Sequence, residues 1–370
     1  MILRCIAGRR GRRPLQRLQH IQSHKLHFIR KDNMNKRILK NTEWSILICV
    51  IVLTIIGLIA LYSATIDSEL DEFKKQCIWI LIGLPIMISI LFVDYNIIVR
   101  FSPYLYGLSI VLLIGVLFTP KINGASSWFN IGFFAFQPAD LAKVFVIMFL
   151  SYVIVEIQKK SKKEINKLSR LAIIFGTVFL PLLLIIFQPD YGTAIAYIIS
   201  LVLILYVAGI NKKYIIIAFL ALVITIPLMY FFILPEHAKS RIDVFLNPNL
   251  DPRGAGYNII QSKIAIGAGK LFGMGWLKGT QTHLGFLYPK TTDFIFSMIG
   301  EELGFITCGL IIVVYVILIT KAINVAKTAR DDLGSYIAIG IVRCIIIPYN
   351  RKHWYDNRTA SNYRSTTSFY

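Results

Sequence analysis

The sequence predicts an all-α fold: a polytopic bundle of transmembrane helices with a long external loop that contains an interfacial helix. Of the 370 residues, 56% are hydrophobic and 16% are charged, and the mean hydropathy is +0.63. A soluble domain carries about 25% charged residues. The charges are also segregated, which leaves apolar runs long enough to cross a bilayer as helices. Strands are not indicated, because backbone groups in lipid must be paired internally.

Nine apolar runs follow one another along the chain, and each is expected to form one span. They lie near residues 44–62, 77–93, 101–118, 141–155, 171–187, 193–208, 214–234 and 294–320, with a weaker ninth run at 333–348. A soluble protein with several buried helices is the alternative. Burying nine such runs would need a larger core than a chain of this length can surround.

The formal net charge of +20 indicates membrane orientation rather than nucleic-acid binding. With the N-terminus inside, residues 158–170, 211–213 and 321–332 face the cytoplasm, and the first of these loops is rich in lysine. The loop 66–74 on the opposite side is acidic. This asymmetry follows the positive-inside rule. The basic loops are also expected to attract anionic lipid.

Both ends of the chain differ in composition from the apolar middle. Residues 1–33 are expected to be a non-native basic extension before a natural start at Met34, with a basic membrane-surface tail as the alternative. Residues 34–348 form the predicted membrane domain, with its external loop at 235–293. The polar residues 349–370 are expected to be a frameshifted tail, because a one-nucleotide shift near Lys352 permits an apolar, proline-containing continuation.

The external loop 235–293 carries two local patterns. Residues 257–266 have apolar side chains at helical spacing, which predicts a helix lying in the outer membrane interface. Five glycines follow between 267 and 279, interrupted by Lys270 and Lys278. Such a segment can offer backbone N–H groups to a phosphate, and a flexible loop is the equally good alternative.

Three carboxylates lie where the loop enters the eighth run. Asp293 stands at the boundary, where desolvation would raise its pKa towards that of a general base. The alternative is that Asp293 caps the following helix. Glu301 and Glu302 lie about two turns deeper, facing lipid or neighbouring helices. Carboxylates at that depth are costly, so a structural pairing or functional role is expected for both.

Several short motifs stand out along the apolar part of the chain. They are Gln188-Pro-Asp-Tyr-Gly-Thr193, Asp251-Pro-Arg-Gly-Ala-Gly-Tyr257, Gln261-Ser-Lys-Ile-Ala-Ile-Gly267, Gly279-Thr-Gln281, Thr292-Asp-Phe-Ile-Phe296 and Glu301-Glu-Leu-Gly304. Together they resemble the SEDS family of peptidoglycan glycosyltransferases, and its RodA branch in particular. Gly124-Ala125, Trp128, Gln137-Pro138 and Lys143 resemble that family's motif before the fourth span, and the whole resemblance covers roughly residues 42–341.

The resemblance implies ten spans in the intact family, location in the bacterial cytoplasmic membrane, an external lipid II site and a class B penicillin-binding transpeptidase as partner. The family's essential aspartate maps onto Asp293. Two departures are Ala139-Asp140 in place of Ser-Glu and Ser127 in place of arginine. The ninth span is compromised and a tenth is not found, so we expect little or no activity from this 370-residue chain alone.

The implied reaction is polymerisation of lipid II at the external face during cell elongation and rod-shape maintenance, with Asp293 as the general base. The leaving pyrophosphate is expected to be stabilised by cations. The expected substrate-binding residues are Lys143, Lys263, Arg241, Gln261, Ser262, Trp128, Gln137, Gln188 and Asp190, and the expected structural or pairing residues are Glu301, Glu302 and Asp140. The five cysteines show no metal-ligand spacing, so no metal residue is assigned, although a divalent cation (Mg²⁺ or Mn²⁺) could share the role. A lipid II flippase and a non-catalytic recruiter of the transpeptidase are the alternative functions.

Overall fold

The computed structural model describes residues 42–66, 69–119, 127–131, 134–233, 236–254, 256–287 and 290–346. All nine predicted runs are helical there, which confirms the all-α prediction. The long helices are α2 (Trp44–Thr65), α3 (Asp71–Leu91), α5 (Ser102–Val116), α6 (Pro138–Gln158), α7 (Leu168–Phe187), α8 (Tyr191–Val207), α9 (Lys212–Leu228), α13 (Ile295–Thr328) and α14 (Asp332–Ile346). The expected extension 1–33 and the expected tail 349–370 lie outside the described residues.

Among the described helices, four are long and apolar enough to cross a membrane: α2, α3, α7 and α13. Three shorter apolar helices lie at Ser102–Val116, Gly192–Val207 and Asp332–Val342. The helix α6 differs from these because many of its residues, Leu150 and Ile154 among them, are buried inside the protein. It therefore lies within the bundle rather than at its lipid-facing edge.

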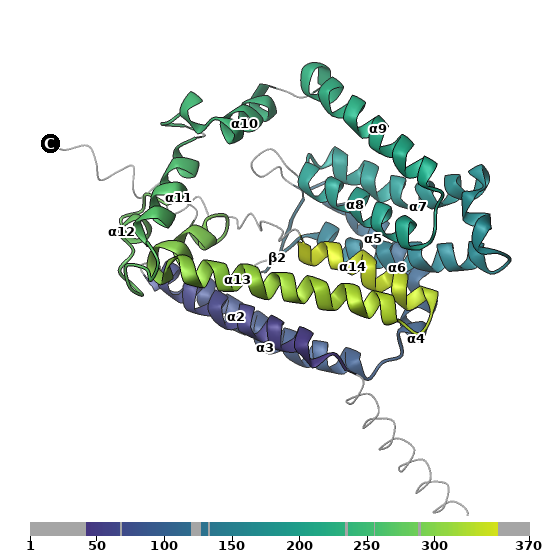
Figure 1. Ribbon diagram of the computed structural model, residues 1–370, viewed down its shortest axis with the longest axis horizontal. Helices are drawn as coiled ribbons and strands as arrows, with labels where there is room; N and C mark the ends of the chain where they lie inside the picture. Colours follow the sequence, from purple (N-terminus) through teal and green to yellow (C-terminus); the bar gives the residue numbers. More distant parts are fainter. Residues whose placement is uncertain are drawn as a thin grey trace, which may run out of the picture.

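The main core forms where α5, α7, α8 and α14 pack around α6 (Figure 1). Gly340 lets α14 approach closely, because a Cβ atom there would come within 2.6 Å of the Ile147 side chain and 2.9 Å of that of Ile204. A second core joins α2 to α13 through small residues such as Ala60 and Ala64. The helix α3 packs mainly on α2 and buries none of its own residues, as expected for a helix surrounded by lipid.

Shorter elements connect the helices. They are α4 (Tyr95–Arg100), η2 (Lys162–Asn166), the π-helical turn η3 (Met229–Ile233), α10 (Glu236–Leu246), η4 (Pro248–Leu250), α11 (Tyr257–Ala268) and α12 (Thr280–His283). Two short strands, β1 (Phe129–Ile131) and β2 (Phe134–Phe136), pair antiparallel just before α6, where no strand was expected. Their aromatic and β-branched residues favour this pairing. The hairpin does not change the fold class.

Candidate functional site

The long helix α13 is broken near its start. Gly304 has φ +83° and ψ 174°, so the helix stops after Leu303 and resumes at Phe305. A break leaves unpaired carbonyls on one side and unpaired N–H groups on the other. The carbonyls of Glu301 and Glu302 accept from Met274 N and Gly275 N at 2.8 and 3.1 Å. The carbonyls of Lys270 and Leu271 then accept from the N–H groups of 305 and 306, at 3.0 and 3.2 Å.

This pairing explains two of the glycines in the loop 235–293, Gly269 and Gly273. A Cβ atom on Gly269 would lie 1.8 Å from the carbonyl oxygen of Gly300, and one on Gly273 would lie 2.1 Å from that of Glu302. Gly269 and Gly273 are therefore needed for the close approach of two backbones. Seven N–H groups of the loop are bonded within the protein: those of residues 269, 270, 273, 274, 275, 277 and 278. These seven N–H groups therefore already have acceptors within the protein and are not free to cradle a phosphate in this conformation.

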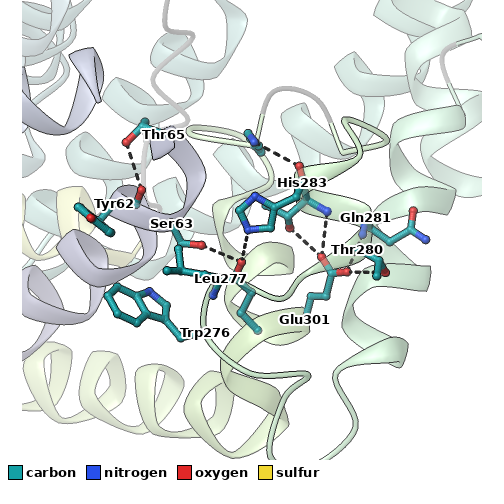
Figure 2. A network of polar contacts seen from close by, with 12 residues as sticks. Tyr62, Ser63, Thr65, Trp276, Leu277, Thr280, Gln281, His283 and Glu301 are labelled. Atoms are coloured by element: carbon teal, nitrogen blue, oxygen red, sulfur yellow. Dashed lines mark hydrogen bonds and ion pairs between the residues drawn. The ribbon is translucent and has the colours of Figure 1, made fainter. Parts of the chain in front are cut away.

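Glu301 is fully buried and faces the start of α12 (Figure 2). Its Oε1 accepts from Gln281 N at 2.7 Å and from the Thr280 hydroxyl at 3.3 Å. Its Oε2 accepts from Thr282 N at 3.1 Å and from the Thr282 hydroxyl at 2.7 Å. The carboxylate thus satisfies the first N–H groups of α12, a role that a capping side chain within that helix would otherwise fill.

Glu302, which is 1% exposed, joins three separate segments. Its Oε1 accepts from the Ser63 hydroxyl of α2 at 2.7 Å and lies 3.1 Å from Nε2 of His283. Its Oε2 accepts from Leu277 N at 3.3 Å. Residues 257–287, called the polar layer below, are therefore fastened both to α13 and to α2. The hydrogen-bond partners of Glu301 lie in the loop, and those of Glu302 lie in the loop and in the neighbouring span α2.

Asp293 lies in the turn that leads into α13 and is half-buried. The position that caps α13 is Phe294, which provides no side-chain hydrogen bond, so the capping alternative for Asp293 finds no support there. The turn is held on both sides. Before it, Nζ of Lys290 donates to the carbonyl of Thr282 at 3.3 Å. After it, the hydroxyls of Ser262 in α11 and Ser297 in α13 lie 2.6 Å apart.

A second polar group lies at the start of α6 and α8. The Gln137 amide donates to Oδ2 of Asp190 at 2.8 Å, and Oδ1 of Asp190 caps α8 by accepting from Thr193 N at 3.1 Å. One helical turn into α6, Nζ of Lys143 lies 2.8 Å from Oδ1 of Asp140. Lys143 is buried and lines a small hollow together with Tyr197 and Ser200 of α8. These contacts bring together four of the predicted residues.

The remaining predicted residues are dispersed. In α11, Gln261 is half-buried and Lys263 is exposed, while Gln188 is buried and its amide donates to the Leu113 carbonyl at 3.1 Å. Trp128 is half-buried just before β1. Arg241 lies in α10, and its side chain is outside the described part of the structure. In the described ranges, no group of three or more His, Cys, Asp or Glu side chains is arranged to hold a metal ion.

No motif in the sequence identifies the partners of the buried glutamates, chiefly Ser63, Thr282 and His283. The sequence did carry one signal for them, since a carboxylate inside a membrane protein requires donors. Hydropathy and motif spacing do not show which loop residues supply those donors.

Comparison with known proteins gives one consistent result. The chain matches the FtsW/RodA/SpoVE cell cycle protein family over residues 43–350. It is 32% identical over 325 residues to the peptidoglycan glycosyltransferase MrdB of Escherichia coli K12, a match that covers 85% of each chain. Its fold resembles a chain of a solved peptidoglycan synthase complex, with TM-score 0.68, 22% identity and coverage of 82% and 83%. It also resembles the rod shape determining protein RodA of Thermus thermophilus, with TM-score 0.58, 21% identity and coverage of 82% and 81%.

Proposed function

The chain belongs to the FtsW/RodA/SpoVE family, and on that premise we propose that it is a peptidoglycan glycosyltransferase that polymerises lipid II. The relative from Escherichia coli carries that activity in its name, and the match extends over most of both chains. The conclusion also fits the membrane bundle, because a lipid-linked substrate places its tail among apolar helices and its head group at their ends.

The observation that carries the proposal is the placement of Asp293. This half-buried carboxylate lies in a turn that is held on one side by the contact of Lys290 with Thr282 and on the other by the hydroxyl pair at Ser297. A general base must keep a constant position relative to the proton that it removes. Asp293 takes the proton from the 4-hydroxyl of the acceptor sugar, whose oxygen attacks the anomeric carbon of the donor. The bond from that carbon to undecaprenyl pyrophosphate breaks.

Negative charge develops on the departing pyrophosphate, so a fixed cation near it would lower the barrier. Lys143 is the best supported of the proposed cations, because it is buried at the start of α6 and oriented by Asp140 at 2.8 Å. Gln137 and Asp190 contribute by fixing the adjacent ends of α6 and α8 to each other. Substrate-binding roles for Lys263, Arg241, Gln261, Ser262, Trp128 and Gln188 are proposed from the family motifs alone. A divalent cation, Mg²⁺ or Mn²⁺, remains part of the proposal as an additional partner of the pyrophosphate.

The wider setting is also proposed. The solved chain of similar fold belongs to a peptidoglycan synthase complex that is described as coordinating polymerisation and crosslinking, which supports a transpeptidase partner. The basic loop 158–170 and the acidic side chains near residue 70 support an N-terminus inside the cytoplasmic membrane. The motifs that resemble the RodA branch favour a role in cell elongation.

The test is polymerisation of fluorescent lipid II by the purified protein in vesicles together with its transpeptidase. Two versions are compared: the 370-residue chain, and a chimera whose residues after 341 are replaced by the corresponding segment of the Escherichia coli relative. We expect glycan chains from the chimera and a loss of about 100-fold or more in Asp293→Asn, the range for removing a general base. The exposed Asp71 provides the control Asp71→Asn, which should retain activity.

Each other outcome has a clear meaning. Equal glycan synthesis by the chimera and its Asp293→Asn variant would refute the assignment of the base. A chimera that moves lipid II across vesicles without polymerising it would be a flippase, and one that does neither while binding the transpeptidase would be a recruiter. Full activity of the unmodified 370-residue chain would show that the expectation about its C-terminus is wrong.

A further inference from the structure

The loop 270–278, called the insertion loop below, carries a run of large apolar side chains on the surface. Leu271, Phe272, Met274 and Trp276 are all exposed, and Phe272 is 81% exposed. Exposed apolar patches of this kind mark interaction surfaces. Two exposed lysines, Lys270 and Lys278, stand at the ends of the run. The loop therefore has the composition of a membrane-contacting segment, with apolar residues between cations.

The backbone of the insertion loop is paired with the backbone of α13. The N–H groups of Met274 and Gly275 donate to carbonyls of α13, and the carbonyls of Lys270 and Leu271 accept from N–H groups of α13. Irregular backbone is tolerated at the depth of the hydrocarbon only where its polar groups are satisfied by protein. The pairing across the break thus allows the loop to enter lipid without leaving these groups unsatisfied.

The length of α13 sets the depth of this pairing. The residues 305–320 contain no charged side chain and, at about 1.5 Å per residue, extend about 24 Å before Lys321. The hydrocarbon core of a bilayer is about 30 Å thick. With Lys321 at one boundary, Gly304 lies about 25 Å away and so about 5 Å short of the opposite boundary. The insertion loop, which is hydrogen-bonded to residues 305 and 306, lies at the same depth.

The exposed surface of the loop continues onto the lipid-facing helices. Phe305 and Ile306 of α13 are exposed beside it, and the Trp276 indole N–H donates to the carbonyl of Ile59 in α2 at 3.4 Å. The Trp276 ring also lies 5.7 Å from that of Tyr62. Tryptophan and tyrosine concentrate at the membrane interface, and lysines extend from there towards lipid phosphates.

We propose that the insertion loop enters the membrane leaflet at the end of the bundle where α11 and α12 lie, with phospholipid as its partner. Leu271, Phe272 and Met274 contact acyl chains. Lys270 and Lys278 contact head-group phosphates. Lipid is the occupant that these observations favour, because the patch continues the lipid-facing surface of α13 and lies at hydrocarbon depth. The inference goes beyond the proposed transferase activity and stands without it.

The test is the depth of a nitroxide spin label in vesicles of phosphatidylethanolamine and phosphatidylglycerol. The full chain, with its native cysteines replaced, is labelled at Phe272→Cys or at Leu250→Cys. Leu250 is an exposed apolar residue of the same external segment, but it is flanked by polar residues and is expected in water. We expect the label at 272 to collide more often with oxygen than with a water-soluble nickel complex, and the label at 250 to show the reverse.

A label at 272 that is as accessible to nickel as the label at 250 would overturn the proposal. Lipid-like accessibility at both positions would overturn it too, because the insertion would not be specific to this loop. A second measurement needs no label: quenching of Trp276 by lipids brominated near the head group, obtained as the difference between the wild-type chain and Trp276→Phe. We expect strong quenching of the Trp276 signal. Absence of quenching would contradict the proposal even if the cysteine variants failed to fold.

Discussion

Replacing Glu301 by glutamine tests whether the buried carboxylate holds the polar layer in place. The carboxylate accepts four hydrogen bonds, two at each oxygen, from residues 280–282. An amide keeps one acceptor oxygen and introduces an NH₂ group that can only donate. Whichever carboxylate oxygen is replaced, the new NH₂ group faces one backbone N–H and one hydroxyl. The hydroxyl can rotate to accept, but the N–H of Gln281 or Thr282 cannot.

The magnitude follows from that count. One buried backbone N–H loses its partner, which costs about 1–3 kcal/mol, and the bonds that remain lose the strengthening provided by a charged acceptor. We therefore expect Glu301→Gln to lower the free energy of unfolding by about 2–4 kcal/mol. The assay is reversible unfolding in mixed micelles with increasing sodium dodecyl sulfate, followed by tryptophan fluorescence. Hydrogen exchange should also rise in residues 280–294.

The matched control is Glu236→Gln in α10, whose side chain is 92% exposed and 3.3 Å from Lys239. Exposed ion pairs contribute about 0–1 kcal/mol, so this variant should unfold like the wild type. A Glu301→Gln protein that also unfolds like the wild type would refute the reasoning. It would mean that the network does not form in solution.

Three further predictions can be checked by the same unfolding assay. Gly304→Ala should be strongly destabilising, because a Cβ atom at φ +83° would lie 2.3 Å from the backbone nitrogen of Gly273. The control Gly309→Ala, in the same helix, has open space around it and should be neutral or slightly stabilising. Equal stabilities of the two variants would contradict the break in α13. Asp190→Ala should cost about 1–3 kcal/mol, because α8 loses its cap and a buried amide of α6 loses its acceptor; no loss would show that this link contributes nothing. Lys162→Ala, which removes a 3.1 Å ion pair with Asp332 between two exposed side chains, should change stability by less than about 1 kcal/mol, and a larger loss would indicate a structural role.

The spans were predictable because the bilayer imposes a simple rule. A segment in hydrocarbon must be apolar and must pair its own backbone, so hydropathy alone locates helices such as α2 and α7. The same rule explains where prediction was incomplete. Residues 294–320 form one apolar run in the sequence, yet the helix that they form is interrupted at Gly304. The break is stable because a loop some thirty residues earlier pairs with the exposed groups, and hydropathy contains no information about that partner.

In the candidate site, too, some features could be predicted from the sequence and others could not. The carboxylate positions could be predicted, since Asp293, Glu301 and Glu302 stand at or inside an apolar run where carboxylates are costly. The glycines of residues 267–279 are also evident in the sequence, but the sequence does not predict that Gly269 and Gly273 pack against the backbone of α13. A glycine needed for close approach and a glycine needed for flexibility are identical in sequence. Only the position of Gly273 against the Glu302 carbonyl separates the two interpretations.

The break in α13 also explains how a carboxylate can be held at the membrane boundary. A continuous helix through residues 295–328 would carry Glu301 and Glu302 into lipid, where each would need protonation or a partner from another span. The break lets a loop enclose both carboxylates, and the donors that satisfy Glu301 include Thr282, whose carbonyl in turn accepts from Lys290. The contacts that make the break tolerable therefore extend to the turn of Asp293. In the role proposed above, Asp293 would act there as the base on a substrate whose head group lies in water and whose tail lies in lipid.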